Sequence, residues 1–362
     1  MRRAGRILAA VVAVSVVIAT LMPFVEAGAW WIRVFDYPRV QVLVLAAAVA
    51  IAWLFVPGAK RRTRALWVGT MVLCGVTQAL TIMRYTPMYP EQVHAAEAGE
   101  AGDDVSLLVS NVLMDNRDAG PLLQLIADNE PDIIAVVETD DWWQEQLKGL
   151  EQSHPHTVQA PLPNTYGMLV YSRLPLHDAE IEYLVSEDIP SMHGRVELRS
   201  GRMVDLHILH PKPPAPKEAT DTDERDAELL IVAKHAKERT EPTIVAGDLN
   251  DVAWSSTTQL FQEISGLLDP RIGRGLYSTY HAQHWAMRWP LDHVFHSEEF
   301  FLVKLERLGD IGSDHFPMFS HLVLDPEAAG DQEEPQADAE DREEANEKIA
   351  EPESTEAENS EG

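Results

Sequence analysis

The chain has 362 residues and a formal net charge of −29 at neutral pH, and its apolar residues are spread unevenly. Residues 1–83 carry nine Lys/Arg against two Asp/Glu, the tail 325–362 carries sixteen acids against two bases, and −22 is left for the middle segment. So acidic a segment lacks the overall positive charge of a protein built to bind long nucleic acids, although it does not exclude a local basic groove.

Three apolar runs, Ile7–Val25, Val40–Val56 and Ala65–Met83, follow one another near the N-terminus. Each approaches the ~20 residues that a helix needs to cross a bilayer core. The first run alone, preceded by arginines at positions 2, 3 and 6, is also typical of a signal peptide. Because two more runs follow at once, we predict a three-span membrane anchor over residues 1–83.

Basic residues predict the orientation of this anchor. They gather at the extreme N-terminus and in the loop from Lys60 to Arg64, and such segments stay in the cytoplasm. Three spans then place everything after Met83 outside. We therefore expect a multi-pass protein of the inner (cytoplasmic) membrane with an extracytoplasmic domain, the lipid bilayer as its partner, and no specific protein partner.

Composition divides the rest of the chain into three parts. Residues 84–103 are rich in proline, glycine, alanine and acids, which predicts a tether. Residues 104–324 have the composition of a globular domain, long enough to bury a substantial core. The acidic tail 325–362 has almost no apolar residues, and we expect it to be disordered.

Within residues 104–324, short β-rich runs alternate with helical patterns, which predicts an α/β domain with buried strands. The expected helices are Gly120–Asn129 and Glu224–Arg239. The expected strands are Val105–Asn111, Ile133–Glu138, Gly167–Ser172, Arg195–Leu198, Val204–His210, Thr243–Asp248, Leu291–His296, Phe300–Arg307 and Met318–Leu324.

One of these strands runs directly into polar residues. The apolar run from Thr243 ends in Gly247, and Asp248 and Asn250 follow. Their spacing of two places both side chains on one face, at a strand exit where functional sites tend to lie. Asp and Asn also favour ordinary turns, so this segment alone fits either a site or a turn.

A second group of polar residues lies near the C-terminal end of the domain. Asp314 and His315 stand between small turn residues and the closing strand, and Asp292 stands inside a strand-like run. A buried charge is unfavourable without a partner, and we expect His315 to be the partner of Asp292. Three further polar residues end predicted strands: Asn111, Glu138 and His210.

Taken together, these segments resemble the endonuclease/exonuclease/phosphatase family over residues 104–324. The matching motifs, in the family's order, are Ser110-Asn111, Val137-Glu138, His210-Pro211, Gly247-Asp248-Leu249-Asn250, Leu291-Asp292-His293 and Ser313-Asp314-His315. The resemblance implies a four-layer α/β (α+β) sandwich, in which two mixed β-sheets pack face to face with helices outside. Two features depart from the classical nucleases and argue against nuclease specificity: Val137, where many members have Gln, and the His-Pro-Lys-Pro-Pro run from His210. The second also suggests a membrane-tethered bacterial branch.

The resemblance also implies roles for the site residues. Glu138 binds Mg²⁺ (or Mn²⁺), with Asn111 and Asp314 completing or supporting the site. Asp248 activates the attacking water or binds the metal, and Asn250 holds its geometry. His315, oriented by Asp292, contacts the phosphate, and His210 lies nearby as a donor or acid.

We therefore predict a membrane-anchored, metal-dependent phosphoesterase that cleaves phosphodiester bonds in nucleic acid, phospholipid or a small molecule outside the membrane. The alternatives are a phosphomonoesterase and an inactive membrane scaffold on the same fold. The full set of polar residues favours catalysis over the scaffold.

Overall fold

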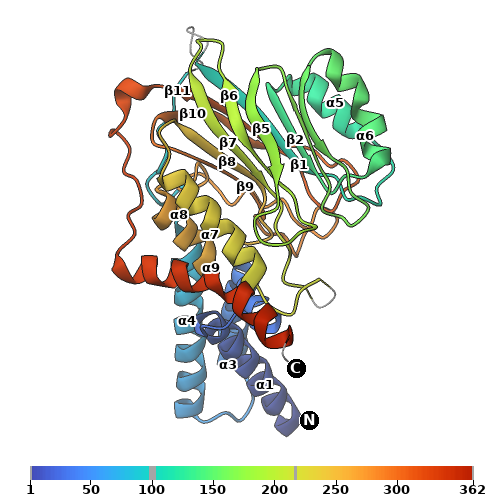
Figure 1. The fold of residues 1–362 in the computed structure, drawn as a ribbon. Coiled ribbons are helices and arrows are strands. Elements are labelled where there is room, and N and C mark those ends of the chain that lie inside the picture. The colour runs from blue at the N-terminus through green and yellow to red at the C-terminus, as the bar shows by residue number, and fades with distance from the viewer. Residues whose placement is uncertain (1, 98–102, 216–217, 361–362) are drawn as a thin grey trace.

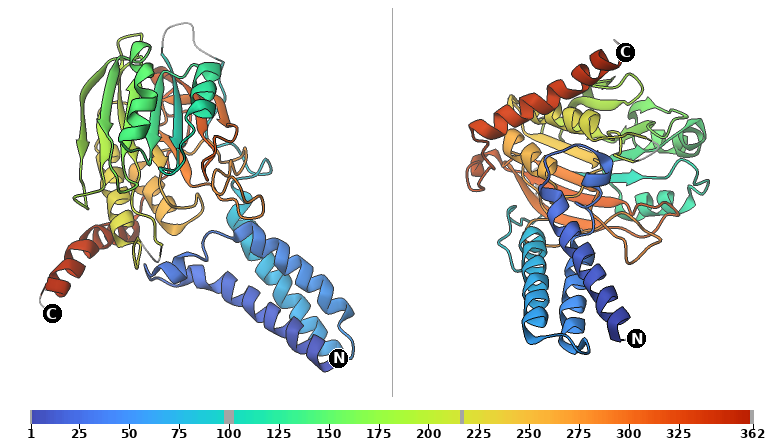
Figure 2. Two further views of the ribbon diagram at one scale, coloured as in Figure 1. Left: turned by 90° about the vertical axis from the view of Figure 1, so that its right-hand side faces the viewer. Right: turned by 90° about the horizontal axis from the view of Figure 1, so that it is seen from below.

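The computed structural model describes residues 2–97, 103–215 and 218–360. Figures 1 and 2 show a β-sheet domain with a bundle of N-terminal helices extending from one end. The helices are α1 (Arg2–Leu21), α2 (Trp30–Arg33), α3 (Arg39–Phe55), α4 (Arg61–Met83), α5 (Gly120–Asn129), α6 (Asp141–Leu147), α7 (Asp223–Lys237), α8 (Ser256–Ser265) and α9 (Ala339–Ser360), with short 3₁₀ helices at Met22–Phe24, Lys148–Gln152 and Pro326–Ala328.

The domain contains two mixed sheets, as the sequence predicts. The first has the order β10-β11-β1-β2-β4-β3 and the second has the order β5-β6-β7-β8-β9. The strands are β1 (Asp104–Asn111), β2 (Ile133–Val137), β3 (His156–Ala160), β4 (Met168–Ser172), β5 (Leu176–Glu182), β6 (Ser191–Glu197), β7 (Met203–Leu209), β8 (Thr243–Asp248), β9 (Asp292–His296), β10 (Phe300–Arg307) and β11 (Met318–Leu324).

Buried apolar residues form three layers around these sheets. The largest cluster fills the space between the sheets, with Leu107 and Val109 from one sheet facing Leu206 and Ala246 from the other. A second cluster joins the first sheet to α5 and α6, and a third joins the second sheet to α7 and α8. Inner strands such as β2, β4 and β8 are buried along their whole length and read as largely apolar runs, whereas edge strands such as β3 and β5 are only partly buried. The order of layers is helix, sheet, sheet, helix.

Strand direction brings the predicted site residues to one end of the domain. β1 and β2 are parallel, as are β7 and β8, so the carboxyl ends of each pair meet at one edge. β9 runs antiparallel to β8, and its first residue, Asp292, lies opposite Asp248, the last residue of β8. Gly247 permits the close packing of β7 and β8, because a Cβ there would overlap the carbonyl oxygen of Leu209.

The N-terminal helices α1, α3 and α4 pack on one another through a cluster that includes Ala13, Ala46 and Met71. Among the described residues, two helices are long and apolar enough to cross a membrane, Arg3–Phe24 and Arg61–Met83, while the apolar helix α3 has 17 residues. The structure therefore supports two of the three predicted spans by length.

The segment predicted to be a tether packs against the domain. Val93 is fully buried in the core between the sheets, Tyr85 donates a hydrogen bond to the carbonyl of Ala253, and Ala95 pairs with Leu302. Residues 98–102 of the predicted tether lie outside the described residues. Residues 84–97 thus link the helical bundle closely to the domain.

The tail also differs from the prediction, because residues Ala339–Ser360 form helix α9 instead of a disordered end. Its few apolar residues gather on one side: Ala345 is fully buried and Ile349 packs on the cluster formed with α7 and α8. The Nζ atom of Lys348 donates to Asp226 of α7 at 3.1 Å. Local composition predicts disorder here, but contacts with α7 supply the stabilisation that an isolated acidic helix lacks.

Candidate active site

Asp248 lies at the centre of a cluster of polar side chains at the strand ends, and it is fully buried. Its Oδ2 atom accepts a hydrogen bond from Nδ2 of Asn111 at 2.9 Å, and its Oδ1 atom accepts one from the backbone N–H of Asn250 at 3.0 Å. Burial raises the pKa of Asp248, and the nearby His315 opposes this shift. The carboxylate is thus held in one orientation by donors on two different strand ends.

His315 pairs with two carboxylates, as the sequence predicts for Asp292. Its Nδ1 atom lies 2.8 Å from Oδ2 of Asp292, and its Nε2 atom lies 3.5 Å from Oδ2 of Asp248. Burial alone would lower the pKa of His315, but Asp248 and Asp292 outweigh it and raise the pKa to about 10. The imidazole is therefore a cation at neutral pH, compensating the buried carboxylates.

Glu138 follows β2 with φ = 60°, in the left-handed region that non-glycine residues seldom adopt. Its Oε1 atom accepts from Nδ2 of Asn111 at 2.7 Å. Burial raises the pKa of Glu138 to about 7, and the neighbouring Asp314 and Asp248 add to the rise while Asn111 and His315 oppose it. Negative charge is in excess around Glu138, which is the setting that a divalent cation stabilises.

Asn111 and Asn250 position other groups. The amide nitrogen of Asn111 donates to both Glu138 and Asp248, while its oxygen accepts from the backbone N–H of Leu113 at 3.0 Å. Asn250 has φ = 52°, and its side chain donates to the carbonyl of Pro211 at 2.9 Å. In this arrangement both residues fix the carboxylates of the site, and Asn111 presents N–H groups to them instead of its oxygen.

His210 stands beside Asp248, with its Nε2 atom 3.9 Å from Oδ2 of that residue. Burial lowers the pKa of His210 to about 4, so its imidazole is neutral at pH 7. Its Nδ1 atom is buried and has no hydrogen-bond partner among the described residues. Of the two roles predicted for His210, a neutral imidazole fits a hydrogen-bond donor and not an acid.

The ligand atoms of Asp248, Asp292 and His315 all lie within 4.8 Å of one another and form a buried group able to hold a metal ion. Oδ1 of Asp292 has no hydrogen-bond partner among the described residues, which leaves it free to act as a ligand. Of the predicted set of Asn111, Glu138 and Asp314, Asn111 turns its N–H groups toward the carboxylates, and the other two offer oxygen atoms, the donors that Mg²⁺ prefers. A protonated His315 cannot bind a metal. The site can therefore place a cation on Glu138 and Asp314 with His315 protonated, or on Asp248, Asp292 and His315 with His315 neutral.

The structure adds residues that no sequence motif indicates. Thr279 Oγ1 accepts from the backbone N–H of Asp292 at 3.3 Å, and the ring of Tyr280 lies 5.0 Å from that of His315. Tyr166 lies 5.6 Å from the ring of His210. These residues come from loops with no periodic pattern, and only the folded chain brings them to the site.

The helical bundle also contacts the site through Tyr37, in the loop before α3. Its hydroxyl donates to the carbonyl oxygen of Asn250 at 2.9 Å, and Nη1 of Arg225 donates to the same oxygen at 3.0 Å. Arg225 in turn is paired with Asp226 at 2.7 Å. The backbone that holds Asp248 is thus supported by the N-terminal region as well as by α7.

We expect Tyr37→Phe to lower turnover up to about fivefold, because losing a bond worth ~1 kcal/mol loosens the backbone of Asn250 while Arg225 still holds it. Steady-state kinetics on a soluble phosphodiester measure this effect. Tyr183→Phe, which alters a half-exposed tyrosine after β5, is the matched control. Equal activity of the Tyr37 variant and wild type would show that the contact does not position the site.

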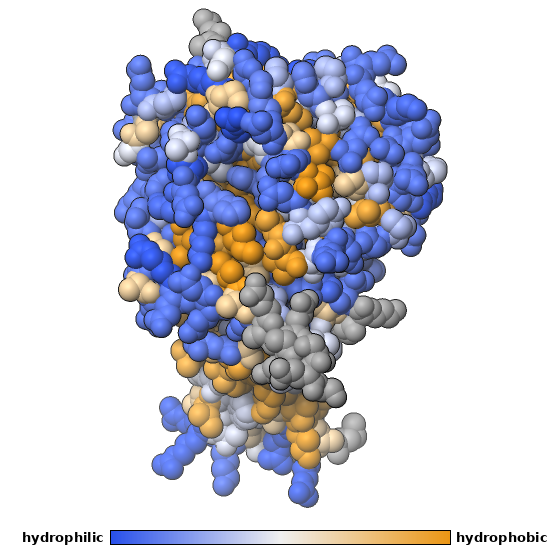
Figure 3. All heavy atoms as spheres, in the orientation of Figure 1, coloured by the Kyte–Doolittle hydropathy of each residue, from blue (hydrophilic) through white to orange (hydrophobic). Residues whose placement is uncertain are grey.

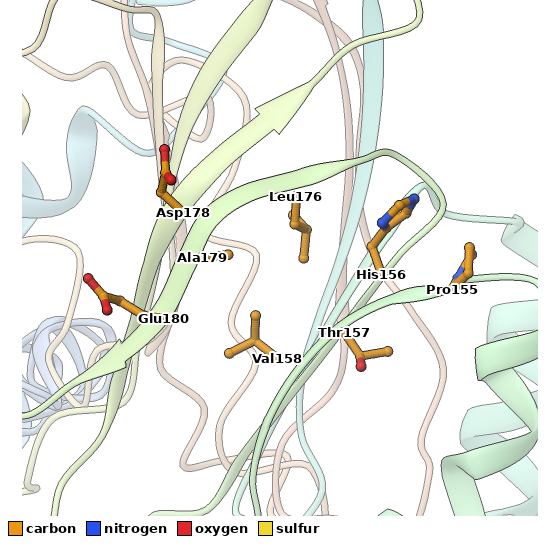
Figure 4. A pocket seen from close by; sticks show the side chains of 8 residues that line it. All are labelled: Pro155, His156, Thr157, Val158, Leu176, Asp178, Ala179 and Glu180. Carbon is orange, nitrogen blue, oxygen red and sulfur yellow. The ribbon is translucent and has the colours of Figure 1, made fainter.

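A cleft of 660 Å³ lies away from this cluster, between the edge strands β3 and β5. Figure 4 shows its lining, which includes Thr157, Val158, Asp178 and Glu180. None of the predicted site residues lines it. The cleft marks where the edges of the two sheets diverge, and the polar cluster at the strand ends remains the candidate active site.

Comparison with known proteins agrees with this geometry. The sequence profile of the Endonuclease/Exonuclease/phosphatase family matches residues 108–315, more than half of the chain, and the chain belongs to this family. Its members are hydrolases of phosphoester bonds, and the buried Asp/Asp/His group makes metal dependence the expected property of this one. No curated protein matches the chain significantly in sequence.

Solved structures share the fold at low sequence identity. D. rerio TDP2 humanized by 14 mutations is 17% identical with a TM-score of 0.50, covering 61% of this chain and 99% of that one. A family protein from Bacteroides thetaiotaomicron is 16% identical with a TM-score of 0.50, covering 62% and 96%. D. rerio TDP2 complexed with a single-strand DNA product is 17% identical with a TM-score of 0.50, covering 60% and 98%.

Proposed function

We propose that the chain is a membrane-anchored, Mg²⁺-dependent phosphodiesterase of a bacterial branch of this family, acting on the outer side of the membrane. The observation that carries this proposal is the convergence of Asp248, the Asp292–His315 pair and Glu138 at one end of the sandwich. A scaffold without catalysis has no need to bury so many charges, each of which costs stability unless it is compensated.

Asp248 has the position and the support of a general base. Its two oxygens are held by Asn111 and by the backbone of Asn250, so that it is oriented before substrate arrives. It accepts a proton from the attacking water, and the imidazolium of His315 stabilises negative charge on the phosphoryl oxygens. His210 donates a hydrogen bond from its neutral ring to the phosphoryl group of the substrate.

The cation is assigned to Glu138 and Asp314, because an all-oxygen set suits Mg²⁺ and leaves His315 protonated for the phosphate. Bound there, Mg²⁺ supplies Lewis-acid polarisation of a phosphoryl oxygen. Asn111 orients Glu138 through its amide N–H. The group of Asp248, Asp292 and His315 remains available to a cation only when His315 is neutral.

Exposed apolar side chains support the membrane anchor. Large residues on the outside of the helical bundle, such as Val14, Leu45 and Leu73, are between 43% and 67% exposed. In Figure 3 hydrophobic residues gather on the bundle, and hydrophilic ones mark its lower end. A soluble protein rarely exposes so much apolar surface, so we propose that α1, α3 and α4 span the bilayer with residues 84–360 outside.

The charge of the domain bears on the class of substrate. The net charge of −22 on residues 84–324 disfavours long polyanions, although the similar D. rerio TDP2 was crystallised with single-strand DNA. A phosphomonoester is the alternative to a diester, since the same residues serve either reaction.

The test is hydrolysis by the purified full chain of bis-p-nitrophenyl phosphate, p-nitrophenyl phosphate, plasmid DNA and phospholipid vesicles, with Mg²⁺ and with EDTA. We expect cleavage of a diester that EDTA abolishes and Mg²⁺ restores. Cleavage of the monoester alone would favour the alternative, and activity that resists EDTA would contradict the proposal.

We further expect Glu138→Gln to need at least ~10-fold more Mg²⁺ for half-maximal activity, because a neutral amide is a poorer ligand than a carboxylate for a hard cation. Titration of activity with Mg²⁺ measures this shift. Glu145→Gln, an exposed residue of α6, is the control. An unchanged Mg²⁺ requirement would remove Glu138 from the metal site.

A further inference from the structure

The loop of residues 281–289, which joins Tyr280 to the start of β9, exposes apolar side chains that the rest of the domain hides. Trp285 is 84% exposed and Met287 is 47% exposed. Among the described residues from 103 to 324, the only other large hydrophobic side chain with comparable exposure is Tyr183. An exposed tryptophan beside an exposed methionine indicates a surface that contacts an apolar partner.

The loop meets the end of the helical bundle. Nε2 of Gln41, in the first turn of α3, donates to the carbonyl of Ala286 at 2.9 Å. Tyr37 packs edge-on against Trp289 at 5.6 Å between ring centroids. Figure 2 shows the domain seated at this end of α3 and α4. Ala286, which follows Trp285 directly, therefore lies at the level where α3 begins.

The same loop forms one side of the active site. The backbone N–H of Ala282 donates to the carbonyl of Asp314 at 2.7 Å, and the side chain of Gln283 donates to the carbonyl of Ser313. Tyr280, at the start of the loop, faces His315. Any surface that the loop touches is consequently close to the catalytic groups.

Arg288 in the loop and Arg307 at the end of β10 give this surface a local positive charge within an acidic domain. The guanidinium groups of Arg288 and Arg307 lie 4.9 Å and 4.3 Å from the ring centroid of Phe316. Among the described residues neither forms an ion pair with a carboxylate, and both line a cleft of 550 Å³. Each donates to a backbone carbonyl, Arg288 to Ala282 and Arg307 to Ser278, so their positive charge is not neutralised by a carboxylate and is suited to phosphate.

We propose that the loop of residues 281–289 lies in the headgroup layer of the bilayer, with Trp285 and Met287 among the lipids and Arg288 beside headgroup phosphates. Tryptophan favours this layer because its ring is apolar and its N–H is polar. The active site then opens toward the membrane surface, and its substrate is a phosphoester carried by a lipid. This inference rests on the membrane anchoring proposed above.

The test places an environment-sensitive fluorophore on the loop of the full chain in lipid nanodiscs. The only cysteine, Cys74, is buried in the bundle, so Cys74→Ala gives a background for Trp285→Cys labelled with NBD. The control is Ser200→Cys in the exposed turn between β6 and β7, at the opposite end of these strands from the site. The readouts are the emission maximum and quenching by spin-labelled phospholipids.

We expect a blue-shifted emission at position 285 and quenching by the spin-labelled lipids several-fold stronger than at position 200. Equal, water-like emission at both positions would overturn the proposal. A blue shift without lipid quenching would also overturn it, because the loop would then contact another protein copy. Since neither readout depends on turnover, failure here is distinguishable from failure of the proposed chemistry.

A second measurement addresses the substrate. We expect Trp285→Ala to lower the ratio of turnover on a vesicle-borne phosphodiester to turnover on bis-p-nitrophenyl phosphate by several-fold, because only the former requires access from the bilayer surface. Tyr183→Ala, which removes an exposed ring elsewhere on the domain, is the matched control. An unchanged ratio would show that the loop does not select a lipid substrate.

Discussion

Asp248→Asn is expected to lower turnover by about 10²–10⁴-fold, the contribution of a positioned general base. The amide keeps the shape of the carboxylate and can still accept from the N–H of Asn250, but it cannot take a proton from water. Because burial disfavours the charged form of Asp248, we expect the neutral variant to remain folded. Single-turnover rates on bis-p-nitrophenyl phosphate and thermal unfolding in detergent measure the two effects separately.

The matched control is Asp205→Asn, on the neighbouring strand β7. Asp205 is half-buried, and burial raises its pKa as it does for Asp248, but it lies at the opposite end of its strand from His210. Its variant should keep wild-type turnover. If Asp248→Asn retained wild-type activity, Asp248 would be neither the base nor an essential metal ligand.

His315→Gln is expected to lose both activity and stability. The imidazolium compensates the carboxylates of Asp292 and Asp248, and its removal leaves them buried without a cation. Breaking a buried ion pair on one side costs about 3–5 kcal/mol in the free energy of unfolding. Turnover should fall by about 10²–10³-fold, since a preorganised charge at the phosphate is lost.

The pH dependence of stability gives this prediction a distinctive signature. The pKa of His315 is raised from 6.5 in the unfolded chain to about 10 in the folded protein. The stabilisation is therefore complete below pH 6.5 and is lost as the pH rises through 10. We expect chemical unfolding in EDTA to show that the difference in the free energy of unfolding between wild type and His315→Gln shrinks from neutral to alkaline pH. A difference independent of pH would show that His315 is neutral in the fold.

His321→Gln is the control for this comparison. His321 lies on β11 at 3.5 Å from Asp104, but both side chains are about one-quarter exposed. A pair that water can still reach contributes less than a fully buried one, so we expect a change below ~1 kcal/mol. A loss as large as that of His315→Gln would contradict the importance of burial.

Much of the domain could be predicted from the sequence, because its signals are local. Strands such as β1, β2 and β8 read as apolar runs of five to eight residues, and buried strands require little else. The sequence does not predict β3 and β5, each of which lies at one edge of its sheet. Their residues are only partly buried and mix polar with apolar side chains, so no clear period marks them.

The acidic tail shows the limit of composition as a guide. Few apolar residues in residues 325–362 predict disorder, yet Ala345 and Ile349 are enough to dock α9 on α7. Lys348 adds a contact with the buried Asp226. A partner surface far away in sequence decides such a case, and composition holds no information about it.

The sequence by itself determined the family and the order of the strand-end motifs. It also required a partner for Asp292, because a charge inside an apolar run is unfavourable alone, and the structure shows that this partner is His315, as predicted. Only the tertiary structure decided which groups face each other. It turned the N–H groups of Asn111 toward Glu138 and Asp248, and it brought Tyr37 to the backbone of Asn250 across more than 200 residues. These contacts depend on the meeting of parallel strand ends and on the docking of the N-terminal helices against the domain. Both are properties of packing, which no local pattern encodes.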